Sequence, residues 1–262
     1  MSAVIEFRDV SVIREGRRIL NRISLRMEEG VCTVIMGISG SGTSVFLKTA
    51  AGIISPDEGK VLLWGKDIEA MSAQEQFVLR EKTGFVFQDA ALWANMSGFQ
   101  NIALPLQYHR RGMSKDEMAV RIGEILQEFN FKTDIERRPV GFSTGERKII
   151  SYMRAMILKP PLLFVDDPKS SIDNAYAKRI LGILKKRKEQ GCTLVVATND
   201  PTYTLRLADN LVILREGAVV EEGTIAGVRA SHDPYVIEIL GDILSIPGIP
   251  PRESAGDGLP GS

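Results

Sequence analysis

The segment Gly37-Ile38-Ser39-Gly40-Ser41-Gly42-Thr43-Ser44 decides how the rest of this chain is interpreted. An apolar run at 31–36, typical of a strand, leads into it, and the run at 44–51 after it predicts a helix. A glycine-rich loop between a strand and a helix suits phosphate, because its backbone N–H groups converge on the anion and the helix N-terminus adds partial positive charge. The residues of this loop that we expect to bind a nucleotide are Gly37, Ser39, Gly40, Ser41, Gly42, Thr43 and Ser44.

One position of the loop departs from the P-loop pattern G-x-x-x-x-G-K-[ST]. Thr43 stands where the pattern has lysine, whereas Ser44 supplies the expected hydroxyl. A lysine would place a full positive charge against the β- and γ-phosphates, and a threonine hydroxyl offers only a neutral hydrogen bond. We therefore expect a loop that holds a nucleotide but is poorly equipped to cleave it.

The composition is that of a globular protein without a bulk charge. The chain has 262 residues, of which 44% are hydrophobic, enough for one sizeable core or two lobes. Its 33 basic and 33 acidic residues cancel, which disfavours nucleic acid as a partner. We find no secretory signal and no stretch close to the ~18–20 apolar residues of a membrane span, so we expect a cytoplasmic protein. Cys32 and Cys192 lie in apolar runs and are expected to be buried free thiols.

The hydrophobic pattern changes twice along the chain. Alternating residues at 4–12 and 19–27 predict two antiparallel strands with a turn at Glu15-Gly16. From about residue 90 to residue 156 helical patterns replace strand patterns, as in Ser114–Phe129, which opens on a serine cap with Glu117 behind it. Strands and helices then alternate, which implies a parallel sheet covered by helices. The strands predicted after the glycine loop are 60–64, 83–87, 162–165, 193–197, 210–215 and 218–222, with helices at 174–188 and 201–207.

These changes predict an α/β fold with three parts. Residues 1–89 and 160–245 are expected to form the core, including an antiparallel β subdomain, and residues 90–159 an inserted α-helical subdomain. Residues 246–262 are rich in proline and glycine, so we expect a disordered tail there.

Three further segments form a recognisable set with the glycine loop. Gln88 ends a predicted strand, and Phe142-Ser143-Thr144-Gly145-Glu146-Arg147 opens a helix about 100 residues after the loop. Leu162-Leu163-Phe164-Val165-Asp166-Asp167-Pro168 is an apolar strand that ends in two carboxylates. In order and spacing, over roughly residues 3–240, the chain resembles the ATP-binding subunits of ABC transporters, in which these segments are the Walker A loop, Q-loop, signature motif and Walker B strand. The resemblance implies an ABC-type P-loop NTPase core.

A closer resemblance concerns the segments after the Q-loop. Phe87-Gln88-Asp89-Ala90-Ala91-Leu92, Asn101-Ile102-Ala103-Leu104-Pro105-Leu106 and the ending His232-Asp233-Pro234-Tyr235-Val236 resemble ATPases of Mla-type phospholipid transporters, which work with MCE proteins. Polar amino-acid importers share part of this pattern. The resemblance implies a peripheral position on the cytoplasmic face of the inner membrane. The partners that it implies are an integral-membrane permease contacting residues 88–106, a second ATP-binding subunit, an MCE substrate-binding protein and a small regulatory subunit.

The resemblance also implies roles for single residues. Its ligands are ATP and Mg²⁺, with Ser44 and Asp166 holding the ion and Gln88 sensing both the ion and the attacking water. Asp173 lies in the segment that matches the D-loop. The residues that match the signature are Ser143, Thr144, Gly145 and Glu146.

Three positions besides the glycine loop depart from the family. Asp167 replaces the glutamate that orients the attacking water; its side chain is one methylene shorter, and a displacement of ~1 Å can cost on the order of a hundredfold in rate. Asn199 replaces the switch histidine and can hydrogen-bond a phosphate oxygen but carries no charge. Thr144 replaces a signature glycine, where its side chain either crowds the phosphate or points away.

Two basic residues have alternative interpretations. Family members often stack an aromatic side chain on adenine at a place where this chain has Arg14, which is either a planar substitute or an ordinary exposed arginine. Lys169 precedes the D-loop segment. We interpret it as a solvated surface lysine rather than as a replacement for the missing P-loop lysine.

The resemblance implies head-to-tail dimers in which each nucleotide lies between one subunit's P-loop and the other's signature. A homodimer would carry every departure in both sites, whereas a heterodimer with an intact paralogue would retain one plausible working site. We therefore expect either a lipid-transporter ATPase whose own hydrolysis is weak or absent, or a non-hydrolytic structural or regulatory subunit of the same kind of complex. A soluble ABC-type protein of translation or DNA repair is disfavoured, because the chain has a single ATPase unit and no long coiled-coil insertion.

Overall fold

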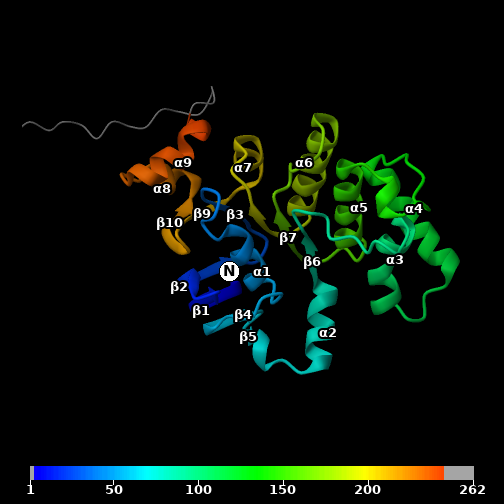
Figure 1. Ribbon diagram of the computed structural model, residues 1–262, viewed down its shortest axis with the longest axis horizontal. Helices are drawn as coiled ribbons and strands as arrows, with labels where there is room; N and C mark the ends of the chain where they lie inside the picture. The colour runs from blue at the N-terminus through cyan, green and yellow to red at the C-terminus, as the bar shows by residue number, and fades with distance from the viewer. Residues whose placement is uncertain (1–2, 245–262) are drawn as a thin grey trace, which may run out of the picture.

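The computed structural model describes residues 3–244, which form two sheets, helices around them and a group of helices at one end (Figure 1). The predicted disordered tail at 246–262 lies outside the described residues. Both changes of pattern along the sequence correspond to changes of architecture. An antiparallel sheet comes first, helices dominate after residue 90, and strands and helices alternate after residue 160.

The first sheet is antiparallel and has the strand order β2-β1-β4-β5. Glu15 and Gly16 form the turn between β1 and β2, with φ of 51° and 74°. The predicted antiparallel pair is therefore confirmed. The strands span Ala3–Arg14 (β1), Arg17–Glu28 (β2), Glu58–Leu63 (β4) and Lys66–Asp67 (β5).

The second sheet has the order β10-β9-β3-β8-β7-β6, and every neighbouring pair except β9 and β10 is parallel. The predicted parallel sheet is confirmed, and its predicted strands differ from the observed ones by two residues at most. Because the parallel strands run the same way, the loops after β3, β6, β7 and β8 meet at one edge, where ligands bind in such sheets. The strands span Cys32–Met36 (β3), Thr83–Val86 (β6), Leu162–Asp166 (β7), Thr193–Ala197 (β8), Asn210–Arg215 (β9) and Ala218–Thr224 (β10).

The helices divide between the sheet and one end of the molecule. α3, α4 and α5 gather at the end away from β1 and β2, whereas α8 and α9 lie beside β10 (Figure 1). The helices span Thr43–Ala50 (α1), Ala73–Lys82 (α2), Gly98–His109 (α3), Lys115–Phe129 (α4), Thr144–Met156 (α5), Asn174–Glu189 (α6), Pro201–Leu207 (α7), Ile225–Arg229 (α8) and Pro234–Leu244 (α9), with short 3-10 turns at Ile68–Ala70 and Pro139–Gly141.

Helices α8 and α9 are absent from the sequence-based prediction, and so is α2, although a capping box formed by Ser72 and Glu75 begins α2. Only Leu79 of this helix is buried, so the helix lacks the apolar periodicity on which the prediction relied. The capping box predicted for Ser114 and Glu117 is confirmed at the start of α4.

Alternate side chains of the second sheet enter two separate cores. Ile35 faces the antiparallel sheet, where the rings of Phe7 and Phe46 stack 4.7 Å apart and join β1 to α1. Val34, the preceding residue of β3, faces the helices. Burial on both faces explains the continuous apolar run before the glycine loop and gives the loop rigid support.

Cys32 and Cys192 are buried free cysteines, as predicted. Within residues 3–244 no helix has the length and apolar character needed to cross a membrane.

Candidate functional site

A cavity of about 630 Å³ opens at the edge of the sheet where the loops after β3, β6, β7 and β8 meet. It brings together residues that lie as far apart in the sequence as Gly37 and Asn199, which are 162 positions apart. The sequence-predicted site residues that line it are Gly37, Ser39, Gly40, Thr43, Ser44, Gln88, Asp166, Asp167 and Asn199. Ser41 and Gly42 belong to the same loop but do not line the cavity.

Close backbone approaches determine the shape of the glycine loop. A Cβ atom on Gly42 would lie 2.8 Å from the Ile19 carbonyl oxygen, and the φ of 100° there is strained for any other residue. A Cβ atom on Gly37 would lie 2.6 Å from the Leu214 carbonyl oxygen. Gly42 also has no side chain with which to cap α1, so the N–H groups of the first helical turn can bind an anion.

Ser44 and Asp166 form the part of the cavity that suits a divalent cation. Ser44 Oγ donates a hydrogen bond to Asp166 Oδ1 at 3.0 Å, so two hard oxygen ligands are already adjacent. Asp166 is 3% exposed, and burial raises the pKa of its carboxyl in spite of that hydrogen bond and of nearby lysines. A cation beside the carboxylate would offset the cost of burying it.

The donor set matches Mg²⁺ better than a metal held wholly by protein. Among the residues that the structure describes, no group of three or more His, Cys, Asp or Glu side chains could hold a metal ion. Mg²⁺ commonly takes one or two protein oxygens and completes its shell with water and phosphate oxygens. Ser44 and Asp166 therefore fit Mg²⁺ bound together with a nucleotide.

Asp167 and Gln88 add polar groups beside this pair. Asp167 has a φ of 47°, a left-handed conformation that aspartate tolerates better than most residues. Its N–H donates to the Ala197 carbonyl oxygen at 3.0 Å, which ties the turn after β7 to the end of β8. Gln88 follows β6 and lines the same cavity. The cavity thus has a carboxylate and an amide that can orient a water molecule.

Asn199 is bonded to the glycine loop itself. Its Nδ2 donates to the Gly37 carbonyl oxygen at 2.8 Å, and its Oδ1 accepts the Gly37 N–H at 3.2 Å. Only the second N–H of the amide remains for a phosphate oxygen. Since an amide does not titrate, this residue can hold the loop but cannot carry a proton.

A buried lysine near the cavity was missing from the sequence-based site. Lys148 of α5 is 1% exposed, and its Nζ donates to the carbonyl oxygens of Phe87 at 2.7 Å, Gln88 at 3.3 Å and Asp166 at 2.9 Å. Burial lowers the pKa of Lys148 to about 8, and nearby carboxylates oppose that shift. The sequence contained one signal for this residue, a lysine on a helix face that is otherwise mostly apolar. That face of α5 is buried in the structure.

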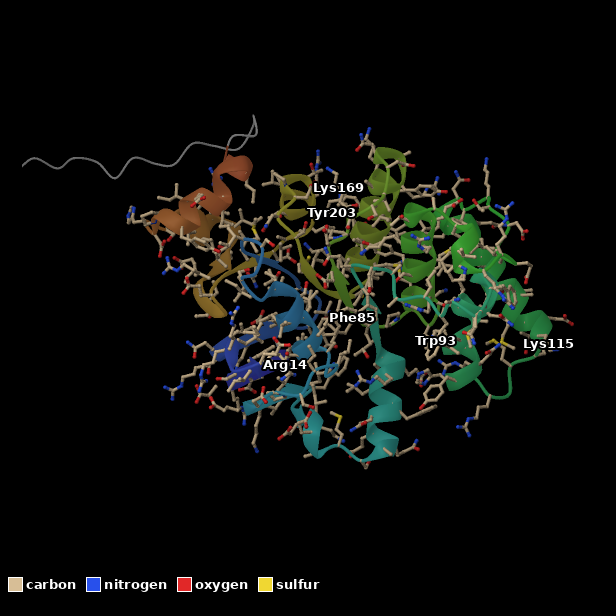
Figure 2. The ribbon with its side chains drawn as sticks, in the orientation of Figure 1. Arg14, Phe85, Trp93, Lys115, Lys169 and Tyr203 are labelled. Atoms are coloured by element: carbon tan, nitrogen blue, oxygen red, sulfur yellow. The ribbon has the colours of Figure 1, made fainter. Side chains whose placement is uncertain are left out.

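Lys169 is exposed, as the sequence analysis expects, and it also lines the cavity. Its Nζ lies 2.9 Å from Asp200 Oδ2, and the two side chains are 48% and 15% exposed. Burial alone would raise the pKa of Asp200, but the Lys169 bond and the N–H of Tyr203 hold that pKa below its ordinary value. The Tyr203 N–H donates to Asp200 Oδ1 at 3.1 Å, so Lys169 and α7 contact the same carboxylate; Lys169 and Tyr203 are both labelled in Figure 2.

The charges around the cavity are unbalanced. Among the described residues that line it, Lys169 is the one cation, and three carboxylates oppose it, those of Asp166, Asp167 and Asp200.

The residues that match the signature do not line this cavity. Ser143 caps α5, with Ser143 N–H donating to Glu146 Oε2 at 2.8 Å and Glu146 N–H donating to Ser143 Oγ at 3.2 Å. Thr144 Oγ1 accepts from Arg147 Nη2 at 3.1 Å, so this side chain is bonded within its own helix. A Cβ atom on Gly145 would lie 3.0 Å from a carbonyl oxygen of a neighbouring loop. A single chain therefore does not bring the glycine loop and the signature together.

Asp173 and Arg14 also lie outside the cavity. Asp173 caps α6 by accepting the Tyr176 N–H at 2.8 Å. Arg14, at the end of β1, has its Nη1 3.2 Å from Asp57 Oδ2 (Figure 2). These contacts do not test a role at a subunit interface or against adenine, so both assignments stay predictions.

Known proteins share this arrangement of segments. The family model described as ABC transporter matches residues 20–170. The intermembrane phospholipid transport system ATP-binding protein MlaF of Escherichia coli (strain K12) is 31% identical over 264 residues, covering 99% of this chain and 97% of that protein. The lipoprotein-releasing system ATP-binding protein LolD of Aquifex aeolicus is 32% identical over 225 residues, covering 86% of this chain and 99% of that protein. Among solved structures, the dimeric post-hydrolysis state of the ATP-binding cassette MJ0796 bound to ADP and Pi is 28% identical with a TM-score of 0.78, covering 84% of this chain and 98% of that one.

Proposed function

The chain belongs to the ABC transporter family as an ATP-binding subunit, and we propose that the complex it serves moves phospholipid between membranes. The observation that supports this cargo is the similarity to MlaF over 97% of that protein's length. Relatives with other cargoes have similar identities, so the argument rests on coverage of both chains and on the segments after Gln88 that resemble the same subfamily.

Different residues of the cavity are proposed to bind the phosphates, the ion and the attacking water. Backbone N–H groups of the glycine loop hold the phosphates, and Ser44 and Asp166 hold Mg²⁺. The bound ion supplies positive charge that stabilises the phosphoryl group during transfer. Gln88 and Asp167 orient the attacking water, and Asn199 holds the first glycine of the loop in place.

Hydrolysis in this chain's own site is proposed to be slow. Thr43, Asp167 and Asn199 line one cavity, so all three departures act on the same transition state. Loss of one preorganised charge-stabilising donor typically costs ~10²–10³ in rate, and losses among groups that act together need not add. The chain is therefore proposed to bind ATP and to turn it over at least on the order of a hundredfold more slowly than an intact site.

A second candidate is a non-hydrolytic structural or regulatory subunit of the same kind of complex. The contact that favours it is the pair of hydrogen bonds between the Asn199 amide and the backbone of Gly37. Asn199 therefore holds the glycine loop at a position where the family has a histidine, which can titrate. Such a subunit would bind the same permease and show no turnover.

The proposed partners follow from the family and from two surfaces. ABC cassettes work with membrane permease subunits and dimerise. The proposed permease contact is a groove of about 360 Å³ beside α3, lined by Leu104, Pro105 and Tyr108 among others. The proposed second ATP-binding subunit, identical or paralogous, would place its signature against this cavity. An MCE substrate-binding protein, a small regulatory subunit and a position on the cytoplasmic face of the inner membrane complete the proposal.

ATP turnover by the complex purified with its permease tests the chemistry. We expect slow turnover in wild type and an increase of about tenfold or more for Thr43→Lys. Asp167→Asn should change turnover little, because its amide oxygen can still accept a hydrogen bond from the attacking water. Normal wild-type turnover that Asp167→Asn abolishes would overturn the proposed impairment. No turnover in wild type and in Thr43→Lys, with Mg-ATP still bound, would favour the structural subunit.

The cargo is tested separately, by transfer of labelled phospholipid between donor and acceptor vesicles that contain the assembled complex. If this chain forms a working site with an intact paralogue, transfer should require ATP. An assembled complex that binds Mg-ATP but neither transfers phospholipid nor copurifies with it would exclude this cargo.

A further inference from the structure

The cavity presents negative charge where a nucleotide would add more. Its described lining includes the carboxylates of Asp166, Asp167 and Asp200, and Thr43 contributes no compensating charge. A nucleoside triphosphate is strongly anionic, and like charges at close range disfavour binding. Mg²⁺ held by Ser44 and Asp166 would offset part of this charge. Because position 43 is threonine, the terminal phosphates would still lack the lysine that the usual P-loop provides.

We propose that Lys169 is the missing cation, and that its ammonium group leaves Asp200 when a nucleotide binds and contacts the terminal phosphates instead. The inference rests on the proposed function, because it requires a nucleotide in this cavity. It deepens that function by naming the side chain that compensates for Thr43.

The position of Lys169 suits such an exchange of partners. It comes two residues after Asp167, so the rigid end of β7 fixes where its backbone lies relative to the carboxylates. Its Nζ is at the cavity wall, 2.9 Å from Asp200 Oδ2, and its side chain is 48% exposed. An ion pair with this much exposure is weak and screened by salt, and the long stem of lysine is flexible. The ammonium can therefore change partners at little cost.

Two other lysines affect the pKa of Asp166, but neither is placed to reach a phosphate. Lys148 is 1% exposed and donates to three main-chain carbonyl groups. Lys48 belongs to the second turn of α1 and does not line the cavity. Lys169 is left as the cation that shares the cavity with Thr43.

Asp200 offers a variant that separates this role from a structural one. Its Oδ1 caps α7 by accepting the N–H groups of Thr202 at 2.9 Å and Tyr203 at 3.1 Å, whereas its Oδ2 accepts from Lys169. Asparagine can keep the cap through its amide oxygen and cannot form the ion pair. Asp200→Asn should therefore release the ammonium without unfolding the start of α7.

The test is the dissociation constant of Mg-ATP, measured by titration calorimetry on the full chain. Lys169→Met should weaken binding about tenfold, the usual effect of losing a charge-assisted hydrogen bond. Asp200→Asn should bind at least as tightly as wild type. Lys169→Met should cost much less in a Thr43→Lys background, because the restored lysine takes over the contact, and its effect on Mg-ADP should be smaller than on Mg-ATP.

Lys185→Met is the matched control, because Lys185 is an exposed lysine on α6 whose Nζ lies 3.9 Å from Glu189 Oε1, away from the cavity. It should bind Mg-ATP like wild type, and thermal unfolding should show every variant folded. Equal binding by wild type and Lys169→Met overturns the inference alone. Equal weakening by Lys169→Met and Asp200→Asn indicates a structural ion pair and also overturns it. Wild type that binds no Mg-ATP overturns the proposed function as well.

Discussion

The ionised side chain of Asp166 destabilises the folded protein. It is 3% exposed, and burial raises its pKa. A carboxyl group whose pKa rises on folding destabilises the folded state wherever it is ionised, because the unfolded chain ionises more readily. The cation that Ser44 and Asp166 are suited to hold would remove this cost, so function explains why a buried charge stands at the end of β7.

Asp166→Asn is therefore expected to raise the thermal unfolding midpoint of the nucleotide-free protein at neutral pH. The amide oxygen can still accept the Ser44 hydrogen bond, and the buried charge is gone. The pKa of Asp166 is higher in the folded than in the unfolded protein. Ionised Asp166 therefore destabilises folded wild type at neutral pH, and this destabilisation disappears as the pH falls through the folded pKa. The difference between variant and wild type should therefore shrink toward about pH 4.

Unfolding followed by circular dichroism in the presence of a chelator would measure this difference. Added Mg-ATP should stabilise wild type and not the variant. A variant that melts below wild type at neutral pH would contradict the expectation.

Helix α5 joins two motifs that are separate in the sequence. Its N-terminus carries the signature residues, and its side chains hold the loop after β6. Lys148 donates to the carbonyl groups of Phe87 and Gln88, and Arg154 donates to those of Ala90 at 2.9 Å and Ala91 at 2.7 Å. The segment that matches the Q-loop is thus hydrogen-bonded, within one chain, to the helix whose first residues match the signature.

Lys148→Met should loosen this connection. The variant removes the donor shared by three carbonyl groups, so amide hydrogen exchange at residues 87–89 should rise by about fivefold, the effect of losing ~1 kcal/mol from a local opening. Mass-spectrometric exchange on the nucleotide-free protein would measure the change.

Arg147→Met is the control on the same helix, because Arg147 donates to Phe142 and Thr144 at the signature turn and not to the Q-loop. Its exchange at residues 87–89 should match wild type. A folded Lys148→Met protein with unchanged exchange there would show that the loop is held by other contacts.

At the scale of the whole molecule, two of the large exposed apolar side chains, Trp93 and Tyr108, lie on or next to α3. Trp93 and Tyr108 are 57% and 53% exposed, and Figure 2 shows Trp93 beside the helical group. Tyr108 lines the groove that we propose as the permease contact. Exposed aromatic groups beside a groove are typical of a surface that a partner covers.

Tyr108→Glu should reduce copurification of the permease by about tenfold or more, since it places a charge in a largely apolar contact. Affinity for Mg-ATP should not change, because Tyr108 does not line the nucleotide cavity. Quantitative pull-down of the tagged permease would measure the loss.

Val120→Glu provides the comparison, because Val120 is 62% exposed on α4 and does not line the groove. It should retain the permease. Loss of the permease in both variants would point to a general effect of added charge, and retention in both would remove the groove from the proposal.

The sequence by itself determined the order of most strands and helices, the parallel sheet and the phosphate-binding character of the glycine loop. These features depend on neighbours along the chain, as in the apolar run that leads into Gly37 or the serine cap before α4. It also identified nine of the residues that line the cavity, although not Lys169 or Asp200, because parallel strands bring the segments after β3, β6, β7 and β8 to one edge. It missed α2, which buries too little apolar surface to show a period, and it made no prediction for α8 and α9.

Only the tertiary structure decided what the side chains in and around the cavity do. Lys148 reaches residues about 60 positions away, Asn199 binds Gly37 across 162 positions, and Lys169 meets Asp200 across 31. No periodicity or local motif encodes such contacts, since they arise when the sheet brings distant loops together. In the sequence, Thr43 indicates only that the P-loop lysine is missing. In the folded chain, Thr43 and Lys169 line the same cavity, so a lysine from another loop lies in the cavity that lacks the P-loop lysine.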